Sequence, residues 1–209
     1  MIKNIILFFV FLILPNFSLA CDKEDFLKYV SAEKNRCIAL QTIGEINKNK
    51  KNLIIFLHGD LSSGTKPPGK KGYWKLGNEL LSKNVNFFFL ARPGYTLDSG
   101  RKSYGSYKET RKAKTNYKWE KLELVAKAAQ NLKEYYNADN LIMIGHSGGA
   151  LTSATINSRV PKLIDKSILI SCPCDFEKWR KMRGESVYKM KTSPHKNISG
   201  ISKDSHTII

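Results

Sequence analysis

Long apolar runs are scarce in this sequence. The longest, residues 5–14, is shorter than the roughly 20 residues that a helix needs to span a bilayer. It follows Lys3 and precedes Ser18-Leu19-Ala20, whose small residues match a signal-peptidase site. We therefore expect residues 1–20 to be a cleaved signal peptide, which places the mature protein in a periplasmic or extracellular compartment. A bacterial lipoprotein is the alternative, and only lipid on Cys21 would then attach the protein to a membrane.

Cysteines and histidines are also few, with four of each in 209 residues. In an oxidising compartment the cysteines are expected to form disulfides, and four cysteines allow three pairings. Cys21 with Cys37 is the pairing that forms most easily, whereas we expect Cys172 and Cys174 to lie too close together to pair without strain. No metal site is expected, because Cys172-Pro173-Cys174 lacks a second pair of ligands.

Acidic residues are outnumbered by basic ones, 18 against 35, and the formal net charge is +17. Such an excess fits an anionic partner, but the lysines are scattered along the whole chain. The densest segment, residues 101–121, interleaves bases with aromatic residues, and we interpret it as a solvated loop that leads into a helix. No nucleic-acid-binding motif accompanies it, so a nucleic-acid partner is not expected.

The chain does contain a regular alternation of predicted strands and helices. Continuous apolar runs predict strands that are buried on both faces of a sheet, at residues 52–60, 85–95, 141–145 and 167–173. Apolar residues at helical spacing predict the intervening helices, at residues 74–83, 119–136 and 150–158. This alternation predicts an α/β fold, with a mostly parallel sheet flanked by helices, in a single domain of residues 21–209.

Gly145-His146-Ser147-Gly148-Gly149 directly follows one of the predicted strands. The spacing fits the G-x-S-x-G nucleophile elbow, in which a sharp strand-to-helix turn exposes a serine hydroxyl. The glycines two residues before and after Ser147 remove side chains that would collide in this turn, and the Gly148 N–H is placed to stabilise an oxyanion. The same glycines lack the spacing of a phosphate-binding loop or a dinucleotide-binding motif. A structural glycine-rich turn is the alternative, and no cofactor is expected.

Three motifs in order, "FLHGD" (56–60), "ARPGY" (91–95) and "IGHSGGA" (144–150), resemble the α/β-hydrolase superfamily from about residue 52 onward. The resemblance implies that Ser147 is the catalytic nucleophile. It also implies that the backbone N–H of Asp60, or of its neighbour Leu61, joins that of Gly148 as an oxyanion donor. His58 and His146 match motif positions that are structural in the family.

The resemblance also implies a catalytic acid and a histidine, which the family places after its last strands. Here "HTII" (206–209) resembles the start of such a strand, so both residues are expected beyond Ile209. Asp175 is at a place where some members carry the acid, but we interpret it as a helix cap. His195 and His206 lie at or before the final strand, away from the expected loop. The chain therefore resembles an α/β hydrolase whose C-terminal part is missing.

Two functions remain open at this point. The first is an exported serine hydrolase that cleaves an ester or peptide bond through an acyl-enzyme on Ser147, with a small molecule or peptide as its substrate. The second is a catalytically inactive fragment, or a non-enzymatic binding remnant of the same fold. The sequence identifies neither the substrate nor the oligomeric state.

Overall fold

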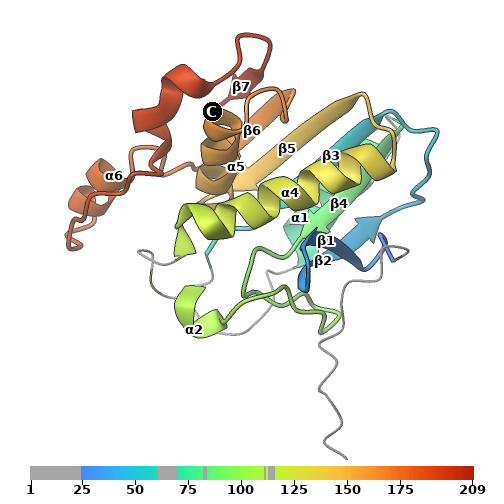
Figure 1. The fold of residues 1–209 in the computed structure, drawn as a ribbon, viewed down its shortest axis with the longest axis horizontal. Helices are drawn as coiled ribbons and strands as arrows, with labels where there is room; N and C mark the ends of the chain where they lie inside the picture. The colour runs from blue at the N-terminus through green and yellow to red at the C-terminus, as the bar shows by residue number, and fades with distance from the viewer. Residues whose placement is uncertain (1–24, 61–69, 82–83, 111, 113–115) are drawn as a thin grey trace, which may run out of the picture.

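The structure of the protein is a computed structural model that describes residues 25–60, 70–81, 84–110, 112 and 116–209. The predicted signal peptide and Cys21 lie outside the described residues, so those interpretations stay predictions. Within the described part, seven strands form one sheet in the order β1-β2-β4-β3-β5-β6-β7 (Figure 1). The strands are β1 (Tyr29–Glu33), β2 (Arg36–Ile43), β3 (Asn52–Leu57), β4 (Val85–Leu90), β5 (Asn140–His146), β6 (Lys166–Ile170) and β7 (His206–Ile208).

The sheet is mostly parallel, as the sequence predicts. Five neighbouring strands, β4, β3, β5, β6 and β7, run parallel, and β1 and β2 add an antiparallel edge. The sequence pattern missed β1 and β2, because burial alternates along β1 and is broken by half-buried positions in β2. Their sequences therefore lack the long apolar runs of the central strands.

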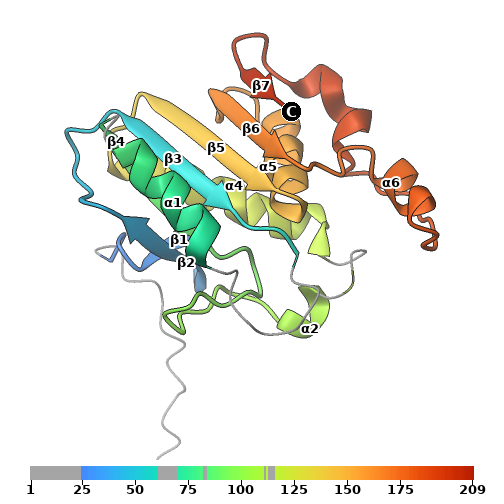
Figure 2. The same cartoon turned by 180° about the vertical axis from the view of Figure 1, so that it is seen from behind.

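Helices cover both faces of the sheet. Figure 1 shows α4 (Trp119–Tyr135) and α5 (Gly148–Arg159) over one face, and Figure 2 shows α1 (Lys70–Leu81) over the other. The shorter helices lie in connections: α2 (Tyr107–Thr110), α6 (Phe176–Met182) and the 3₁₀ helix η1 (Pro194–Gly200). Among the described residues, no helix is long and apolar enough to cross a bilayer.

The central strands bury side chains on both faces. Leu53, Ile55 and Leu57 of β3 belong to the core beneath α4, and Ile54 and Phe56 belong to the core beneath α1. This two-sided burial explains the continuous apolar run in the sequence, since successive side chains of a strand point to opposite faces. The core therefore holds the carboxyl ends of β3, β4, β5 and β6 together at one edge of the sheet.

Candidate active site

Ser147 lies in the sharp turn between β5 and α5. Its backbone has φ 52° and ψ −115°, a conformation that is rare and strained for a residue with a side chain. The Ser147 N–H donates a hydrogen bond of 2.8 Å to the carbonyl of Ile170, at the end of β6. The predicted strand–turn–helix geometry is therefore confirmed, and a neighbouring strand holds the turn in place.

The glycines on either side of the serine have no room for a side chain. A Cβ at Gly145 would lie 2.5 Å from the backbone nitrogen of Ala150. A Cβ at Gly149 would overlap the carbonyl oxygen of Leu57 and lie 2.6 Å from that of His58. These close approaches pack the start of α5 directly against the end of β3.

The turn after β3 packs against the serine turn. A Cβ at Gly59 would lie 3.1 Å from the Cβ of Ser147, and a Cβ at Gly148 would lie 2.7 Å from Oδ1 of Asp60. The structure thus brings together Ser147, Gly148 and Asp60, the three site residues that the sequence predicts. Leu61, the alternative oxyanion donor, lies outside the described residues.

The Asp60 carboxylate accepts hydrogen bonds from four side chains. Its Oδ1 pairs with the Arg92 guanidinium and accepts from Tyr95 at 3.1 Å and from Asn116 at 3.0 Å, while Oδ2 accepts from the Tyr117 hydroxyl. The Arg92 side chain is only 3% exposed, whereas that of Asp60 is 42% exposed. Asp60 therefore connects a buried polar cluster to solvent.

Sequence reasoning missed this cluster. Asn116 and Tyr117 belong to the basic segment that was interpreted as a solvated loop, yet both side chains are buried. That interpretation is wrong for these two positions, because both side chains donate hydrogen bonds to Asp60 and are buried. Asn116 is 56 positions and Tyr117 is 57 positions away from Asp60 in the sequence, so a local pattern does not reveal these contacts.

The cluster determines the protonation states of the side chains beside Ser147. Burial raises the pKa of Asp60, but the charge of Arg92 and the hydrogen bond from Tyr117 outweigh burial, so the pKa lies below its ordinary value. Burial also raises the pKa of Tyr117 well above its ordinary value, and the charge of Asp60 adds to this effect. At neutral pH the cluster therefore holds an ionised Asp60 against a protonated Tyr117.

His58 has a structural role, as the resemblance implies. The ring is fully buried, its Nε2 accepts a hydrogen bond of 3.1 Å from the Arg92 N–H, and its Nδ1 lies 2.7 Å from the Gly59 carbonyl, to which it donates. Burial and, to a smaller extent, the charge of Arg92 together lower the pKa of His58 to about 3. The neutral ring connects the turn after β3 with the turn after β4.

The other candidate triad residues lie elsewhere. Asp175 caps α6 by accepting a hydrogen bond of 3.1 Å from the Lys178 N–H, which confirms its interpretation as a helix cap. The Nδ1 of His195 lies 2.9 Å from the Ser193 hydroxyl, and His206 is exposed on β7. Of the described residues, no histidine lines the cavity that contains Ser147.

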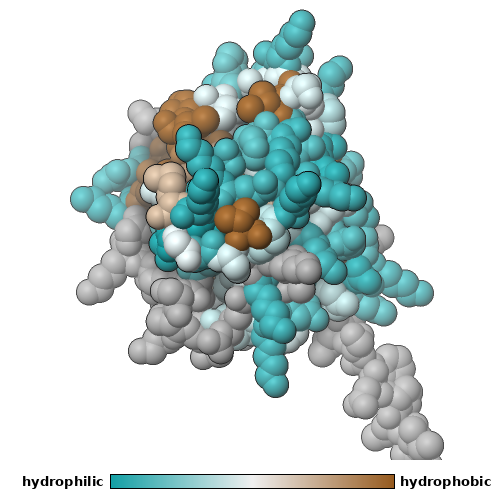
Figure 3. All heavy atoms as spheres, turned by 90° about the vertical axis from the view of Figure 1, so that its left-hand side faces the viewer, coloured by the Kyte–Doolittle hydropathy of each residue, from teal (hydrophilic) through white to brown (hydrophobic). Residues whose placement is uncertain are grey.

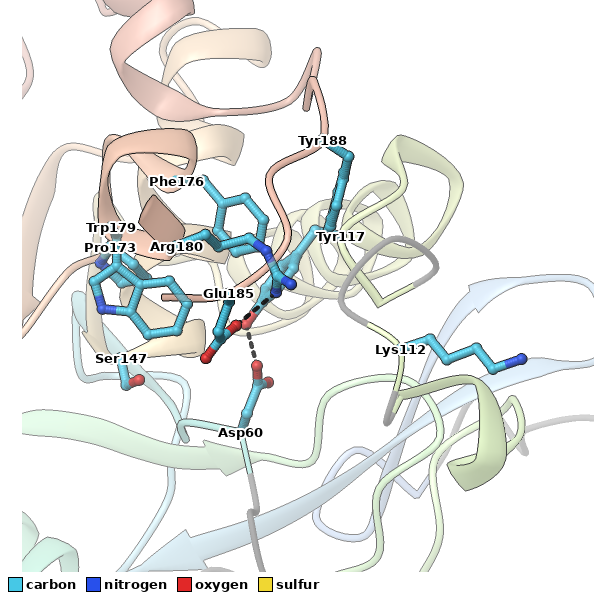
Figure 4. A pocket seen from close by; sticks show the side chains of 10 residues that line it. All are labelled: Asp60, Lys112, Tyr117, Ser147, Pro173, Phe176, Trp179, Arg180, Glu185 and Tyr188. Atoms are coloured by element: carbon cyan, nitrogen blue, oxygen red, sulfur yellow. Dashed lines mark hydrogen bonds and ion pairs between the residues drawn. The ribbon is translucent and has the colours of Figure 1, made fainter. Parts of the chain in front are cut away.

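That cavity has a volume of about 500 Å³, and Figure 4 shows side chains from several segments converging on it. Its lining residues are Asp60, Lys112, Tyr117, Ser147, Pro173, Phe176, Trp179, Arg180, Glu185 and Tyr188. The outer wall comes mainly from α6 and the segment that follows it. There Arg180 pairs with Glu185 at 2.9 Å and stacks over the rings of Phe176 and Tyr188.

The surface on the side of α6 is mainly hydrophilic, and its hydrophobic side chains form a few separate patches (Figure 3). No group of three or more metal-ligating side chains is found among the described residues. The cavity itself combines the aromatic side chains of Phe176, Trp179 and Tyr188 with charged side chains and the serine hydroxyl.

A disulfide joins Cys172 and Cys174 on either side of Pro173, which lines the cavity, although their spacing in the sequence predicts that these cysteines pair only with strain. Their Cα atoms are 5.1 Å apart, within the range of about 4.4–6.8 Å that disulfides accept, because the chain bends at Pro173 instead of staying extended. The predicted strand over residues 167–173 accordingly ends early, at Ile170, before Ser171 with φ 52°. Cys37 is also disulfide-bonded, and its predicted partner lies outside the described residues.

No family model and no curated protein match the sequence. The fold, however, is similar to those of solved hydrolases. An esterase from Pyrococcus furiosus shares 21% identity over 77% of this chain and 56% of its own, with a TM-score of 0.55. An esterase from Butyrivibrio proteoclasticus, solved with ferulic acid, shares 18% identity over 80% of this chain and 60% of its own, also with a TM-score of 0.55.

A proline iminopeptidase from Mycobacterium smegmatis shares 13% identity over 75% of this chain and 47% of its own, with a TM-score of 0.52. The chain thus spans about half to three fifths of the length of these three proteins. Likenesses at such low identity establish the fold. Together with the sheet order and the strained serine turn, they show that this protein has the fold of the α/β-hydrolase superfamily.

Proposed function

We propose that this protein is an exported serine hydrolase that cleaves an ester or peptide bond through an acyl-enzyme on Ser147. The observation that carries the proposal is the strained backbone of Ser147 at the β5–α5 turn, with its side chain in a cavity. Backbone strain of this kind persists where a fold holds a residue for function. The solved esterases and the peptidase of the same fold support this reaction class.

In the proposed reaction, Ser147 Oγ attacks the substrate carbonyl, and the carbonyl oxygen becomes an oxyanion. The backbone N–H groups of Gly148 and Asp60 donate hydrogen bonds to this oxyanion, and the positive N-terminal end of α5 adds a favourable field. The ionised Asp60 side chain lies close by, and the buried Arg92 guanidinium offsets its charge. The aromatic outer wall accepts the apolar part of the substrate.

The hydroxyl of Ser147 needs a base to remove its proton. None of the described cavity residues is a histidine, so the described part of the cavity shows no histidine in the place of this base. The same observation favours a second candidate function, a binding protein of this fold that keeps the serine turn without turnover.

A fluorophosphonate probe separates the two functions. We expect the purified chain to be labelled on Ser147, and the Ser147→Ala variant to lose all labelling. Ser153→Ala is the matched control, because Ser153 is buried further along α5 and is not among the described residues that line the cavity. Absence of labelling in wild-type protein that is folded by circular dichroism would overturn the hydrolase proposal for this chain and leave the binding function.

A further inference from the structure

The Cys172–Cys174 disulfide closes a ring of only three residues in the wall of the cavity. Pro173, the residue between the cysteines, is buried and lines the same cavity as Ser147. Both cysteines are half-buried and pack against Ala150 and Ala154 of α5. The disulfide therefore touches the helix that begins at the serine, while part of each cysteine remains exposed.

Stabilisation of the folded state is a poor explanation for this disulfide. The entropy that a disulfide removes from the unfolded chain grows with the length of the loop it closes, and a three-residue loop gives the smallest gain. The bond also follows Ser171, whose positive φ is unfavourable for a residue with a side chain. A bond that stabilises little and can be reached from solvent has the properties of a reducible disulfide rather than a structural one.

The backbone at this disulfide supports several parts of the cavity. The Cys174 carbonyl accepts hydrogen bonds of 3.2 Å from the Ser193 hydroxyl and from the His195 N–H. Ser193 in turn accepts a hydrogen bond of 3.1 Å from the N–H of Phe176, the first residue of α6. These hydrogen bonds connect the backbone at the cysteines with α6, the helix that carries Trp179.

We propose that the Cys172–Cys174 disulfide is a site of thiol–disulfide exchange that takes a dithiol, and that opening it loosens the Pro173 wall of the cavity. One thiolate of the dithiol attacks a sulfur of the disulfide, forms a mixed disulfide and releases the other cysteine as a thiolate. The second thiol of the reagent, as its thiolate, then displaces the bound cysteine. Two electrons pass from the dithiol to the protein, the dithiol becomes a cyclic disulfide, and its two protons end on Cys172 and Cys174.

Alkylation after graded reduction tests the exchange step in the full chain without any substitution. The folded protein is equilibrated with mixtures of reduced and oxidised dithiothreitol, quenched with acid, alkylated and digested with trypsin. Cleavage after lysine and arginine yields residues 167–178 with both cysteines of the pair, and residues 37–48 with Cys37 alone. Cys37, which is also disulfide-bonded, serves as the control within the same molecule.

We expect residues 167–178 to take up two alkyl groups at a dithiothreitol concentration about tenfold lower than residues 37–48 require to take up one. Circular dichroism should show that the chain is still folded at that point. Equal resistance of the two peptides, earlier reaction of Cys37, or reaction only after unfolding would each overturn the proposal.

Tryptophan fluorescence tests the connection to the cavity. Reduction should shift the emission of the wild-type protein, and Trp179→Phe should abolish most of the shift because Trp179 lines the cavity. Trp119→Phe, at the start of α4, is the matched control and should keep the shift. The Cys172→Ser/Cys174→Ser double variant should show no response to the dithiol. A shift that Trp179→Phe leaves intact would overturn the connection between disulfide and wall.

Discussion

The hydroxyl of Tyr117 fills the space beside Gly148 that a side chain at that position would otherwise occupy. The same hydroxyl donates a hydrogen bond to Asp60. The glycine at position 148 and the polar cluster around Asp60 therefore depend on each other. A larger residue at position 148 would displace the donor that holds the carboxylate.

Gly148→Ala should destabilise the protein by about 1–3 kcal/mol, because the added methyl group overlaps the Tyr117 oxygen. Tyr117→Phe removes that oxygen, so Gly148→Ala should destabilise the Tyr117→Phe variant by less than it destabilises the wild type. Urea denaturation of the wild type, both single variants and the double variant measures the coupling free energy. Additivity within about 0.5 kcal/mol would show that the two positions are independent and contradict the prediction.

Asp60→Asn should reduce the free energy of unfolding by on the order of 2–3 kcal/mol, because it leaves the buried Arg92 guanidinium without a negative partner. Asp204→Asn, which removes the same charge from an exposed position, should change stability by less than about 0.5 kcal/mol. Chemical denaturation checks both variants. Equal effects of the two substitutions would mean that net charge, and not the contact with Arg92, determines the loss.

Ser147→Gly should be more stable than Ser147→Ala by about 1 kcal/mol, because glycine adopts φ 52° and ψ −115° without the strain of a side chain. Ser153 supplies the opposite control in the interior of α5. There glycine should be less stable than alanine by about 1 kcal/mol, as helix propensity dictates. Thermal unfolding of the four variants shows whether glycine or alanine is more stable at each position. The same order of stability at both positions would argue against strain at Ser147.

Stability should fall as the pH decreases from about 6.5 toward 3, because burial lowers the pKa of His58 to about 3. In this range the unfolded chain binds a proton that the folded His58 does not, which costs up to about 1.4 kcal/mol per pH unit. The lowered pKa of Asp60 acts in the same direction, since its stabilisation is lost as the pH falls through that pKa. Urea denaturation at several pH values measures the slope.

His58→Gln should flatten this slope, because the residue that titrates is gone. His206→Gln is the control and should leave the slope unchanged, since His206 is exposed on β7. An unchanged slope in the His58 variant would assign the acid sensitivity to other groups.

The central part of the fold could be predicted from the sequence. The apolar runs of β3 and β5 predict strands that are buried on both faces, and the structure confirms them. The serine turn could also be predicted, since two glycines around Ser147 are the local requirement of that geometry. Each of these features depends on residues that are close together in the sequence.

The rest depends on contacts over long distances in the chain. Nothing near Tyr117 in the sequence indicates that Asp60 will accept a hydrogen bond from it, because the two are 57 residues apart. The Cys172–Cys174 bond was not favoured for a different reason: the two cysteines are only two positions apart, and the sequence does not show the backbone bend that places their Cα atoms 5.1 Å apart. Asp175 was identified correctly because helix capping is a local interaction.

Six of the ten described residues that line the cavity come from one short stretch of chain, residues 173–188. The serine, in contrast, is held by glycine contacts and by β6, which that stretch does not supply. The lining of the cavity and the position of the serine can therefore change separately among related proteins. Exchanging residues 173–188 for a different sequence would change which molecules reach Ser147 while the serine keeps its place in the sheet.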